Sequence, residues 1–345
     1  MPHPVDNDNM ELVIRSSPYQ FRSGLRAAAE LETLPRGTFR RLLVAGMGGS
    51  AMPVTLVGEG GLAAIPVAAH MSYDLPVGID PSDTLVIVSS FSGNTEETIS
   101  AYETARDQGF ALVGISKGGR LQELCEADEV PHVRIPVKPE EQKMQPRCAT
   151  GYGVGILVGL LDRLGLAATG ARETIEALEQ HLLDRMEQAC AEGEALAGSL
   201  TAATPIVYAS HRYANVARIW KIKFNENAKC PAFWNVFPEL NHNEMTGWLH
   251  HPGPFHLILL RDPEEDPRVR LREEITCEIL KQEAGLEATG VIMLGENRIE
   301  KMFGTLLVGD WASYHLALRL DEDPSPVKIV ETFKRMLEQR RKSVE

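Results

Sequence analysis

The fold is decided by the stretch RLLVAGMGGSA at residues 41–51. Its apolar first half is typical of a buried strand in a parallel sheet, and the glycines that follow indicate a tight turn into a helix from about Ser50. Further strands are expected at residues 65–70, 84–89, 110–115 and 132–137, and a helix at residues 95–108. Such βαβ alternation predicts a parallel, doubly wound sheet that is flanked by helices.

The second half of the chain repeats this alternation. Strands are expected at residues 205–209, 255–260 and 290–294, and helices at 213–224, 268–283, 298–320 and 327–339. Between the halves, the glycine-rich apolar segment 151–164 predicts a closely packed helix, and the charged segment 172–200 predicts a solvated bridging helix. We therefore expect an α/β chain of two doubly wound, flavodoxin-like domains, at residues 1–165 and 201–345, joined through residues 166–200.

Composition narrows the class of protein. A chain of 345 residues, 43% of them hydrophobic, is long enough to form two cores. Its net charge of −13 argues against a nucleic-acid or anionic membrane partner, because such partners recruit clustered Lys and Arg. The five cysteines include no CxxC pair, the N-terminus has no apolar signal region, and no apolar stretch reaches the roughly 18 residues of a membrane span. We expect a cytoplasmic protein without disulfides.

The glycine-rich turn at residues 46–51 satisfies G-x-G-x-x-G/A, the dinucleotide-binding fingerprint. Asp74 lies near the end of the second expected strand, where an acid that binds a ribose would stand. The motif alone is weak, because glycines also permit a helix to pack closely on a strand. An NAD-dependent dehydrogenase is therefore one hypothesis, and an anion bound at the helix N-terminus is another.

The turn SSFSGNTEET at residues 89–98 favours a phosphate ligand. Ser90, Ser92 and Thr95 surround a glycine between the third expected strand and the next helix. Hydroxyl groups donate to phosphoryl oxygens while the helix N-terminus supplies partial positive charge, so no lysine is required. The alternative is that Thr95 only caps the helix, which would leave Ser90 and Ser92 without a role. The absence of a GK[ST] ending disfavours a P-loop kinase.

A second polar block runs from NEN at residues 225–227 to PELNHNE at residues 238–244. Glu226 suits a general base and His242 an acid–base partner, because a carboxylate and an imidazole can exchange protons near neutral pH. The alternative for His242 is a hydrogen bond that stabilises a loop. The asparagines are expected to orient charged neighbours, and the two flanking prolines to stiffen a turn between the two parts of the block.

The histidines in and after this block lack the spacing of a metal site. His242, His250, His251 and His256 fall within fifteen residues together with Glu244, but they match no HExxH motif. The pair at residues 250–251 precedes Pro-Gly-Pro and is expected in a solvent-facing turn. We expect neither a metal nor a redox cofactor.

Two cations remain as candidates. Arg147 lies before the glycine-rich helix, near the carboxyl edge of the first sheet, and Lys334 lies in the last helix. Without other information, each is most often an ordinary surface charge.

Taken together, the chain resembles the bifunctional phosphoglucose/phosphomannose isomerase family, whose members have two sugar isomerase (SIS) domains. The resemblance covers nearly the whole chain and rests on GMGGS at 46–50, SSFSGNTEET at 89–98, PR at 146–147 and NENAKCPAFWNVFPELNHNE at 225–244. The SGNT loop is shared by SIS proteins broadly, whereas the last block is more specific to this branch. Ala51 departs from the family's glycine and is followed by Met52-Pro53, so the first helix is expected to begin later or to bend.

The resemblance implies reversible conversion of glucose 6-phosphate to fructose 6-phosphate without a metal or cofactor, in glycolysis and gluconeogenesis, with mannose 6-phosphate left open as a substrate. Glu226 would shuttle the proton between C1 and C2 through a cis-enediol, and Arg147 would stabilise the enediolate. His242 of the neighbouring protomer in a homodimer would open the sugar ring, and Lys334 would assist at the ring oxygen. The residues assigned to the phosphate are Gly49, Ser50, Ser90, Ser92 and Thr95. A non-catalytic sugar-phosphate-binding SIS protein is the alternative.

Overall fold

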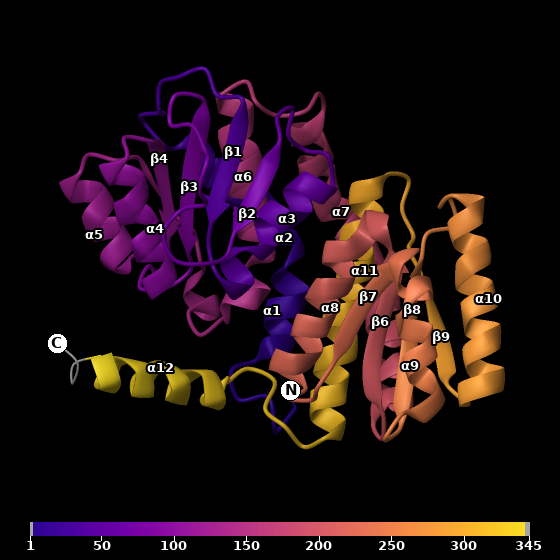
Figure 1. Cartoon of the computed structure of the whole chain (residues 1–345). Coiled ribbons are helices and arrows are strands. Elements are labelled where there is room, and N and C mark those ends of the chain that lie inside the picture. The colour runs from indigo at the N-terminus through magenta and orange to yellow at the C-terminus, as the bar shows by residue number, and fades with distance from the viewer. Residues whose placement is uncertain (1–2, 342–345) are drawn as a thin grey trace.

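The first sheet is parallel throughout, with the strand order β2-β1-β3-β4-β5. The computed structural model describes residues 3–341. The strands of this sheet are β1 (Arg41–Ala45), β2 (Val67–His70), β3 (Thr84–Ser90), β4 (Ala111–Ser116) and β5 (His132–Arg134). This order confirms the doubly wound prediction, and its direction reverses between β1 and β3 (Figure 1). The segments that follow these two strands therefore meet at the carboxyl edge, where such sheets bind ligands.

Side chains of the first sheet alternate between two helical layers, as strand geometry requires. Leu43, Val86 and Val88 belong to a core with α4 (Glu96–Asp107) and α5 (Gly119–Ala127). Residues between them on the same strands, such as Val44 and Ile87, face the opposite core. The helices of that core include α1 (Met10–Ser16), α2 (Pro18–Ala29), α3 (Met52–Glu59) and α6 (Thr150–Arg163).

The start of the N-terminal half departs from one prediction and confirms another. The polar N-terminal segment gave no helix prediction, yet it forms α1 and α2. Helix α3 begins at Met52, after the short 3-10 helix Gly48–Ser50, so the expectation that Met52-Pro53 delays the first helix is confirmed.

Helices α2 and α6 approach each other through glycines. A Cβ atom on Gly155 would lie 2.2 Å from the carbonyl oxygen of Phe21, and one on Gly24 would lie 2.3 Å from that of Tyr152. No side chain fits in these spaces. The prediction that the glycine-rich helix packs closely against other backbones is confirmed.

The second sheet has the order β7-β6-β8-β9 and is also parallel throughout. Its strands are β6 (Thr204–Ser210), β7 (Phe233–Phe237), β8 (Phe255–Arg261) and β9 (Glu287–Ile292). Strand β7 was predicted as a stiffened turn, and that prediction is wrong. Strand β9 begins before the segment expected for it. The helices around this sheet include α8 (Ala214–Asn227), α9 (Glu244–Gly247), α10 (Pro267–Ala284) and α11 (Arg298–Arg319).

Helix α7 (Ala171–Leu200) lies between the two halves, and the prediction of a solvated helix holds for its outer face only. It buries a stripe that includes Ile175, Leu182 and Leu196, and it packs against α2 on one side and α11 on the other. At the crossing with α11, a Cβ atom on Gly193 would lie 2.5 Å from the Cβ of Trp311. Charged residues on the outer face concealed this stripe in the sequence.

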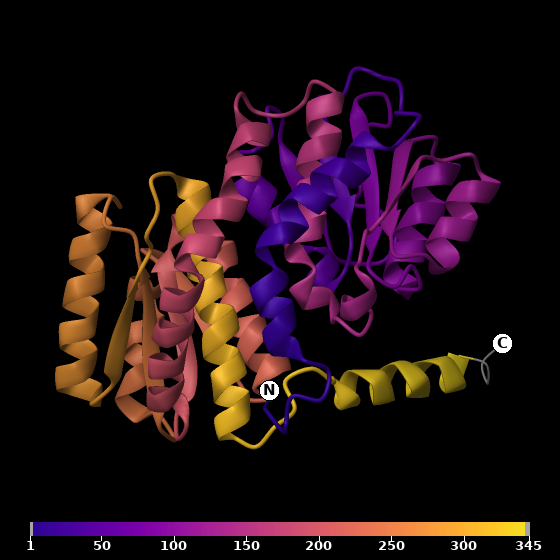
Figure 2. The same ribbon diagram turned by 180° about the vertical axis from the view of Figure 1, so that it is seen from behind.

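The last helix, α12 (Lys328–Arg341), leaves the body of the molecule. Figures 1 and 2 show it extending away from the second sheet, beyond the end of α11. Every residue at positions 328–340 is exposed. Across the described residues 3–341, no helix combines the length and the hydropathy that a membrane span requires.

Candidate active site

The predicted phosphate turn forms a closed loop after β3. The backbone N–H of Gly93 donates to the carbonyl oxygen of Ser90 at 3.1 Å, and the hydroxyls of Ser90 and Thr95 lie 2.9 Å apart. Thr95 occupies the N-cap position of α4, but its side chain makes no capping hydrogen bond. The interpretation of Thr95 as a simple helix cap is therefore not supported.

The hydroxyl oxygens of this loop accept bonds from the backbone, which leaves their protons available to a ligand. The N–H groups of Phe91 and Asn94 donate to Ser50 Oγ at 3.0 Å and Ser92 Oγ at 3.2 Å. Because an oxygen that accepts from the backbone can still donate its own proton, both hydroxyls can bind a phosphoryl oxygen. Either Ser90 or Thr95 adds a third proton, since only one of them is used in their mutual bond.

Gly93 permits a conformation that other residues would strain. Its φ is +75°, and a Cβ atom there would lie 1.7 Å from the carbonyl oxygen of Gly118. We expect Gly93→Ala to weaken phosphate binding by about tenfold or more, because both strain and overlap displace the loop. Isothermal titration with inorganic phosphate measures this loss.

Gly78→Ala is the matched control for this prediction. Gly78 also has a positive φ, +85°, but a Cβ atom there would have nothing within 4 Å. The control is expected to bind phosphate like the unsubstituted chain. Equal affinities for the two variants would contradict the role assigned to the loop.

The turn after β1 lies directly against Arg147. A Cβ atom on Gly49 would lie 2.5 Å from the carbonyl carbon of Pro146 and 2.6 Å from the amide nitrogen of Arg147. Only glycine allows this approach. The candidate phosphate-binding residues of this turn are thereby next to Arg147. Asp74, the candidate residue for binding a ribose, instead accepts a hydrogen bond from Ser100 Oγ of α4 at 2.8 Å.

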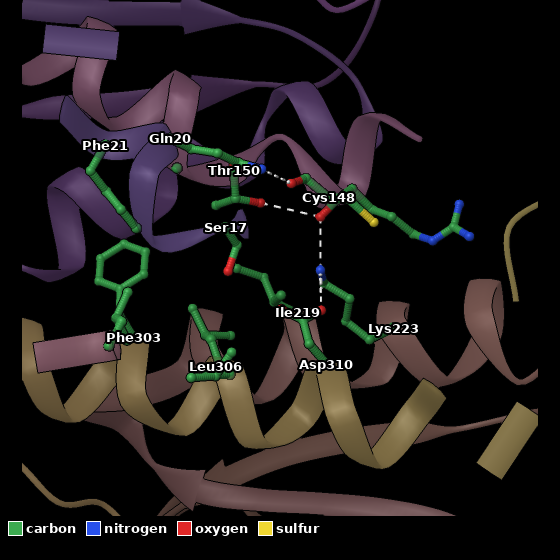
Figure 3. A pocket seen from close by; sticks show the side chains of 14 residues that line it. Ser17, Gln20, Phe21, Cys148, Thr150, Ile219, Lys223, Phe303, Leu306 and Asp310 are labelled. Carbon is green, nitrogen blue, oxygen red and sulfur yellow. Dashed lines mark hydrogen bonds and ion pairs between the residues drawn. The ribbon is translucent and has the colours of Figure 1, made fainter. Parts of the chain in front are cut away.

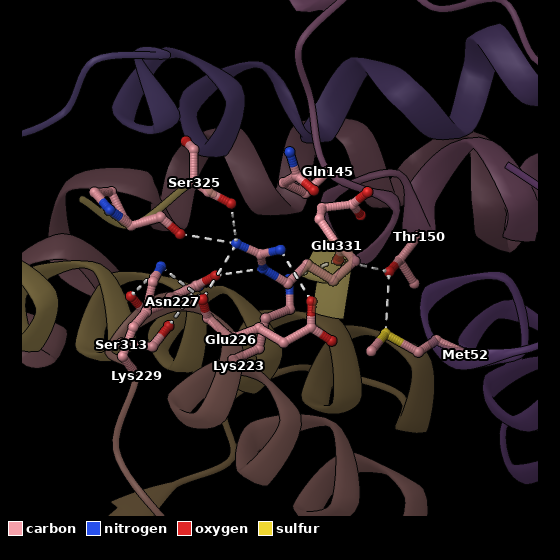
Figure 4. A network of polar contacts seen from close by, with 12 residues as sticks. Met52, Gln145, Thr150, Lys223, Glu226, Asn227, Lys229, Ser313, Ser325 and Glu331 are labelled. Carbon is pink, nitrogen blue, oxygen red and sulfur yellow. Dashed lines mark hydrogen bonds and ion pairs between the residues drawn. The ribbon is translucent and has the colours of Figure 1, made fainter. Parts of the chain in front are cut away.

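Arg147 is fully buried between the two halves of the chain, and its partners Glu226, Asn227 and Ser325 are labelled in the polar network of Figure 4. Nε donates to Asn227 Oδ1 at 2.6 Å, and Nη1 donates to Glu226 Oε2 at 2.9 Å. Nη2 donates to the carbonyl oxygens of Pro324 and Ser325 at 2.8 and 3.0 Å. Four of its five N–H groups are thus used, and one proton on Nη1 remains beside Glu226.

Glu226 keeps one carboxylate oxygen free. Oε2 is held by Arg147, whereas Oε1 accepts no hydrogen bond from any residue in the range 3–341. The side chain is 32% exposed, so a ligand can reach it. A fixed carboxylate beside an available guanidinium proton can remove a proton from carbon while the charge that develops on the adjacent oxygen is stabilised.

Three neighbours of this pair were not identified as site residues from the sequence. Asn227 links Arg147 to α11, because its Nδ2 donates to Ser313 Oγ at 2.9 Å. Lys223 is buried in an ion pair with Asp310, and its Nζ donates to the carbonyl oxygen of Arg147 at 2.8 Å. The third is Lys229, whose pKa is lowered to about 8 by burial and by the charge of Arg147. The expectation that asparagines orient charged neighbours is confirmed at residue 227.

A small cavity lies behind the backbone of Arg147, between α2, α6, α8 and α11 (Figure 3). Its volume is about 50 Å³, and Ser17, Lys223 and Asp310 contribute polar groups to its wall. A space of this size holds one or two water molecules at most. It is therefore too small to hold a sugar phosphate.

The single chain does not bring His242 to this site. Glu226 lies in the last turn of α8, which runs back to the amino end of β7, whereas His242 follows the carboxyl end of the same strand. At about 3.3 Å per residue, β7 separates them by more than 13 Å. Lys334 is also apart from the site's other residues, since it is exposed on α12 and pairs with Glu331 at 3.0 Å.

The segment around His242 is nevertheless held firmly. Glu244 accepts short hydrogen bonds from Tyr208 and Asn235, and Trp248 Nε1 donates to the Tyr208 hydroxyl at 3.0 Å. His242 is exposed, and its side chain makes no hydrogen bond within residues 3–341, so the interpretation of it as a loop stabiliser has no support. The imidazole of His242 is therefore exposed on a segment that the hydrogen bonds of Glu244 hold in place.

The neighbouring histidines are used in other contacts. The ring of His251 lies within hydrogen-bonding distance of the carbonyl oxygens of Gly253 and Ala284, so the expected solvent-facing turn is only partly exposed. His256 Nε2 lies 2.8 Å from Thr289 Oγ1. No group of three metal-ligating side chains occurs among the described residues.

The second sheet also reverses its strand order, between β6 and β8, and its carboxyl edge there carries paired charges of the chain itself. Lys301 Nζ donates to Asp262 Oδ1 at 2.7 Å and to Glu264 Oε2 at 2.6 Å, and the Tyr213 hydroxyl donates to Asp262 Oδ2 at 2.6 Å. Because the carboxylates there already pair with Lys301, this edge is less suited to an anion than the hydroxyl-rich edge of the first sheet.

The chain is similar to known proteins over most of its length. Residues 190–337 match the family model of the bacterial phospho-glucose isomerase C-terminal SIS domain. A bifunctional phosphoglucose/phosphomannose isomerase of Caldicellulosiruptor bescii is 36% identical, over 86% of this chain and 89% of the relative. A D-glucosamine-6-phosphate 4-epimerase of Sulfolobus acidocaldarius is 27% identical, over 85% and 88%.

Solved structures show the same fold. Tagatose-6-phosphate ketose/aldose isomerase of Escherichia coli superposes with a TM-score of 0.63 at 18% identity, covering 91% of this chain and 94% of that one. At that identity the likeness concerns the fold alone, whereas the relative from Caldicellulosiruptor bescii is similar over most of both sequences. The chain belongs to the bifunctional phosphoglucose/phosphomannose isomerase family.

Proposed function

We propose that the protein is an aldose–ketose isomerase that interconverts glucose 6-phosphate and fructose 6-phosphate, in glycolysis and gluconeogenesis. The observation that carries this proposal is the Glu226 carboxylate, which Arg147 fixes through one oxygen while the other stays free. A binding protein without catalysis has no use for such a base. The family relationship supports the same reaction class.

The phosphate is the anchor of the substrate in this proposal. Gly49, Ser50, Ser90, Ser92 and Thr95 hold it through hydroxyl protons and the N-terminus of α4. A flexible open-chain sugar gains most from such an anchor, because a fixed end keeps C1 and C2 in reach of the base.

The proton transfer needs no group beyond the chain and the substrate. Glu226 Oε1 removes the proton from C2 of the aldose, the C–H electron pair forms the C1–C2 double bond, and the carbonyl pair moves to O1. The free Nη1 proton of Arg147 stabilises the resulting enediolate oxygen. The O2 proton then passes to O1, Glu226 returns its proton to C1, and the electron pair left on O2 forms the carbonyl of the ketose. Because C2 is planar in the enediol, the same site can act on mannose 6-phosphate.

A coupled assay with glucose 6-phosphate and mannose 6-phosphate tests the function, with and without a chelator. In deuterium oxide, the product is expected to carry solvent deuterium, because the carboxylic acid exchanges its proton. Binding without turnover would support the sugar-phosphate sensor instead, and loss of activity with the chelator would overturn the proposed chemistry. Glucosamine 6-phosphate is a third substrate in the assay, because one relative is an epimerase of that sugar. Turnover of it alone would contradict the proposal.

The ring-opening groups are proposed to come from a homodimer. His242 lies at the wrong end of β7 to reach Glu226 in its own chain. We expect chains with Glu226→Gln and chains with His242→Ala, each inactive alone, to recover about a quarter of the normal activity when mixed, because half of the random dimers contain one intact site of two. No recovery on mixing would contradict a shared site.

A further inference from the structure

We infer that Lys223 and Asp310 are positioning residues, which hold the main chain of Arg147 so that its guanidinium is aimed at the substrate. The inference rests on the proposed function, in which Arg147 stabilises the enediolate oxygen. Lys223 and Asp310 belong to the second half of the chain and Arg147 to the first, so their contact joins the two halves at the site.

One face of α8 contacts both ends of Arg147. Lys223, Glu226 and Asn227 are spaced i, i+3 and i+4, so their side chains leave the helix on the same side. Asn227 and Glu226 accept from the guanidinium at 2.6 and 2.9 Å. Lys223 Nζ instead donates to the carbonyl oxygen of Arg147 at 2.8 Å. The helix therefore fixes the main chain of this arginine as well as its side chain.

Helix α11 holds this face of α8 through two of its own residues. Asp310 forms an ion pair with Lys223, and Ser313 Oγ, about one turn later, accepts from Asn227 Nδ2 at 2.9 Å. Two rows of contacts thus run from α11 through α8 to Arg147. One row ends on its Nε, and the other, through Lys223, ends on its carbonyl oxygen. The second row sets the point from which the side chain extends.

The main chain of Arg147 lies between a tight contact and a cavity. On one side, a Cβ atom on Gly49 would lie 2.6 Å from the amide nitrogen of Arg147. On the other side is the cavity of about 50 Å³, whose wall includes Lys223 and Asp310 (Figure 3). Thr150 Oγ1 also donates to the Arg147 carbonyl oxygen, but at 3.3 Å. Without Lys223, this carbonyl group would lie beside a space into which it can shift.

Lys223 and Asp310 form a charged pair although they are largely buried. The side chains of the two residues are 6% and 18% exposed. Burial lowers the pKa of Lys223, but the attraction and the hydrogen bond of Asp310 overcome this effect, so that the pKa is raised on balance. A charged donor makes a hydrogen bond roughly twice as strong as a neutral donor does. Lys223 therefore holds the carbonyl group more firmly than the hydroxyl of Thr150 can.

Lys223→Met with Asp310→Asn tests the inference. Because both charges are removed together, no buried charge is left without a partner, and the variant is expected to fold. We expect kcat to fall by about 10- to 100-fold, since a small displacement of a catalytic group costs about that much. The affinity for a five-carbon aldonate phosphate, whose carboxylate takes the place of the enediolate, should fall by a similar factor. The affinity for inorganic phosphate should not change.

Lys301→Met with Asp262→Asn is the matched control. It removes another buried lysine–aspartate pair, in which Nζ and Oδ1 lie 2.7 Å apart, at the carboxyl edge of the second sheet. Urea unfolding should show similar losses of stability in the two double variants. The control is expected to keep the kcat and both affinities of the unsubstituted chain, because it leaves the contact with Arg147 in place.

The outcomes separate the role of the pair from the proposed function. A Lys223 and Asp310 variant with the kcat of the unsubstituted chain would overturn the inference. So would a loss of phosphate affinity as large as the loss of affinity for the aldonate phosphate, because the pair would then act on the fold as a whole. The two affinities are measured without turnover, so they test the pair even in an inactive chain. An unsubstituted chain that binds the aldonate phosphate but converts neither aldose phosphate would contradict the proposed function alone.

Discussion

Glu226→Gln is expected to lower kcat by about 10²–10⁴-fold, the usual contribution of a positioned general base. The substitution preserves shape and can keep a hydrogen bond to Arg147 Nη1 through the amide oxygen, but it removes the free Oε1 as a proton acceptor. KM should change much less, because in the proposed site the phosphate is held by the loop after β3 and not by this side chain.

Two measurements separate this effect from damage to the fold. The affinity of the variant for inorganic phosphate should equal that of the unsubstituted chain, and its exchange of substrate hydrogen with deuterium oxide should be lost together with turnover. Near-normal activity in the variant would show that another group is the base. Loss of phosphate affinity would show that the substitution disturbs the loop.

Arg147→Lys is expected to lower kcat nearly as much as Glu226→Gln does, and to lower the stability of the fold as well. A lysine keeps the positive charge, but it cannot contact Glu226, Asn227 and two carbonyl groups simultaneously, as the planar guanidinium does. Partners left without a donor in a buried site cost about 1–3 kcal/mol each. We expect the free energy of unfolding to fall by about 3 kcal/mol and kcat to fall at least about 100-fold.

Arg163→Lys is the matched control for this variant. Arg163 Nη1 also donates to two carbonyl oxygens, those of Ala28 and Leu31, at 2.6 and 2.7 Å, but it lies away from Glu226. Urea unfolding should show a loss of stability in both variants, whereas only Arg147→Lys should lose turnover. If both variants lose stability and activity in proportion, Arg147 is structural only.

The strands that the sequence predicted correctly are those with a simple physical signature. Strands β1 and β3 are short apolar runs that end in glycine or serine turns, and they are buried on both faces. Strand β7 has no such signature, because it lies at the edge of its sheet with Phe233 and Trp234 exposed and prolines on both sides. Helices α1 and α2 were missed because their buried face is short and lies in a polar segment.

The site was only partly predictable, because its components meet through the tertiary fold. The hydroxyls of the phosphate loop are close in sequence, so their chemistry could be recognised there. Arg147 and Glu226 are 79 residues apart and meet only because α2, α6, α8 and α11 pack together at the centre. No local pattern could show that Arg147 is buried, nor that Lys223 contacts it, and the polar block that contains Asn227 did not show which charged residue Asn227 orients.

The charges at the carboxyl edge of the second sheet have a consequence for how the two halves depend on each other. The two halves repeat one architecture, but Asp262 and Lys301 pair at this edge of the second sheet, whereas the proposed phosphate loop lies at that of the first. The second half instead contributes Glu226, from the last turn of α8. Neither half alone therefore holds both the proposed phosphate loop and the proposed base, and we expect a mutation that separates the halves to abolish activity while leaving every candidate site residue unchanged.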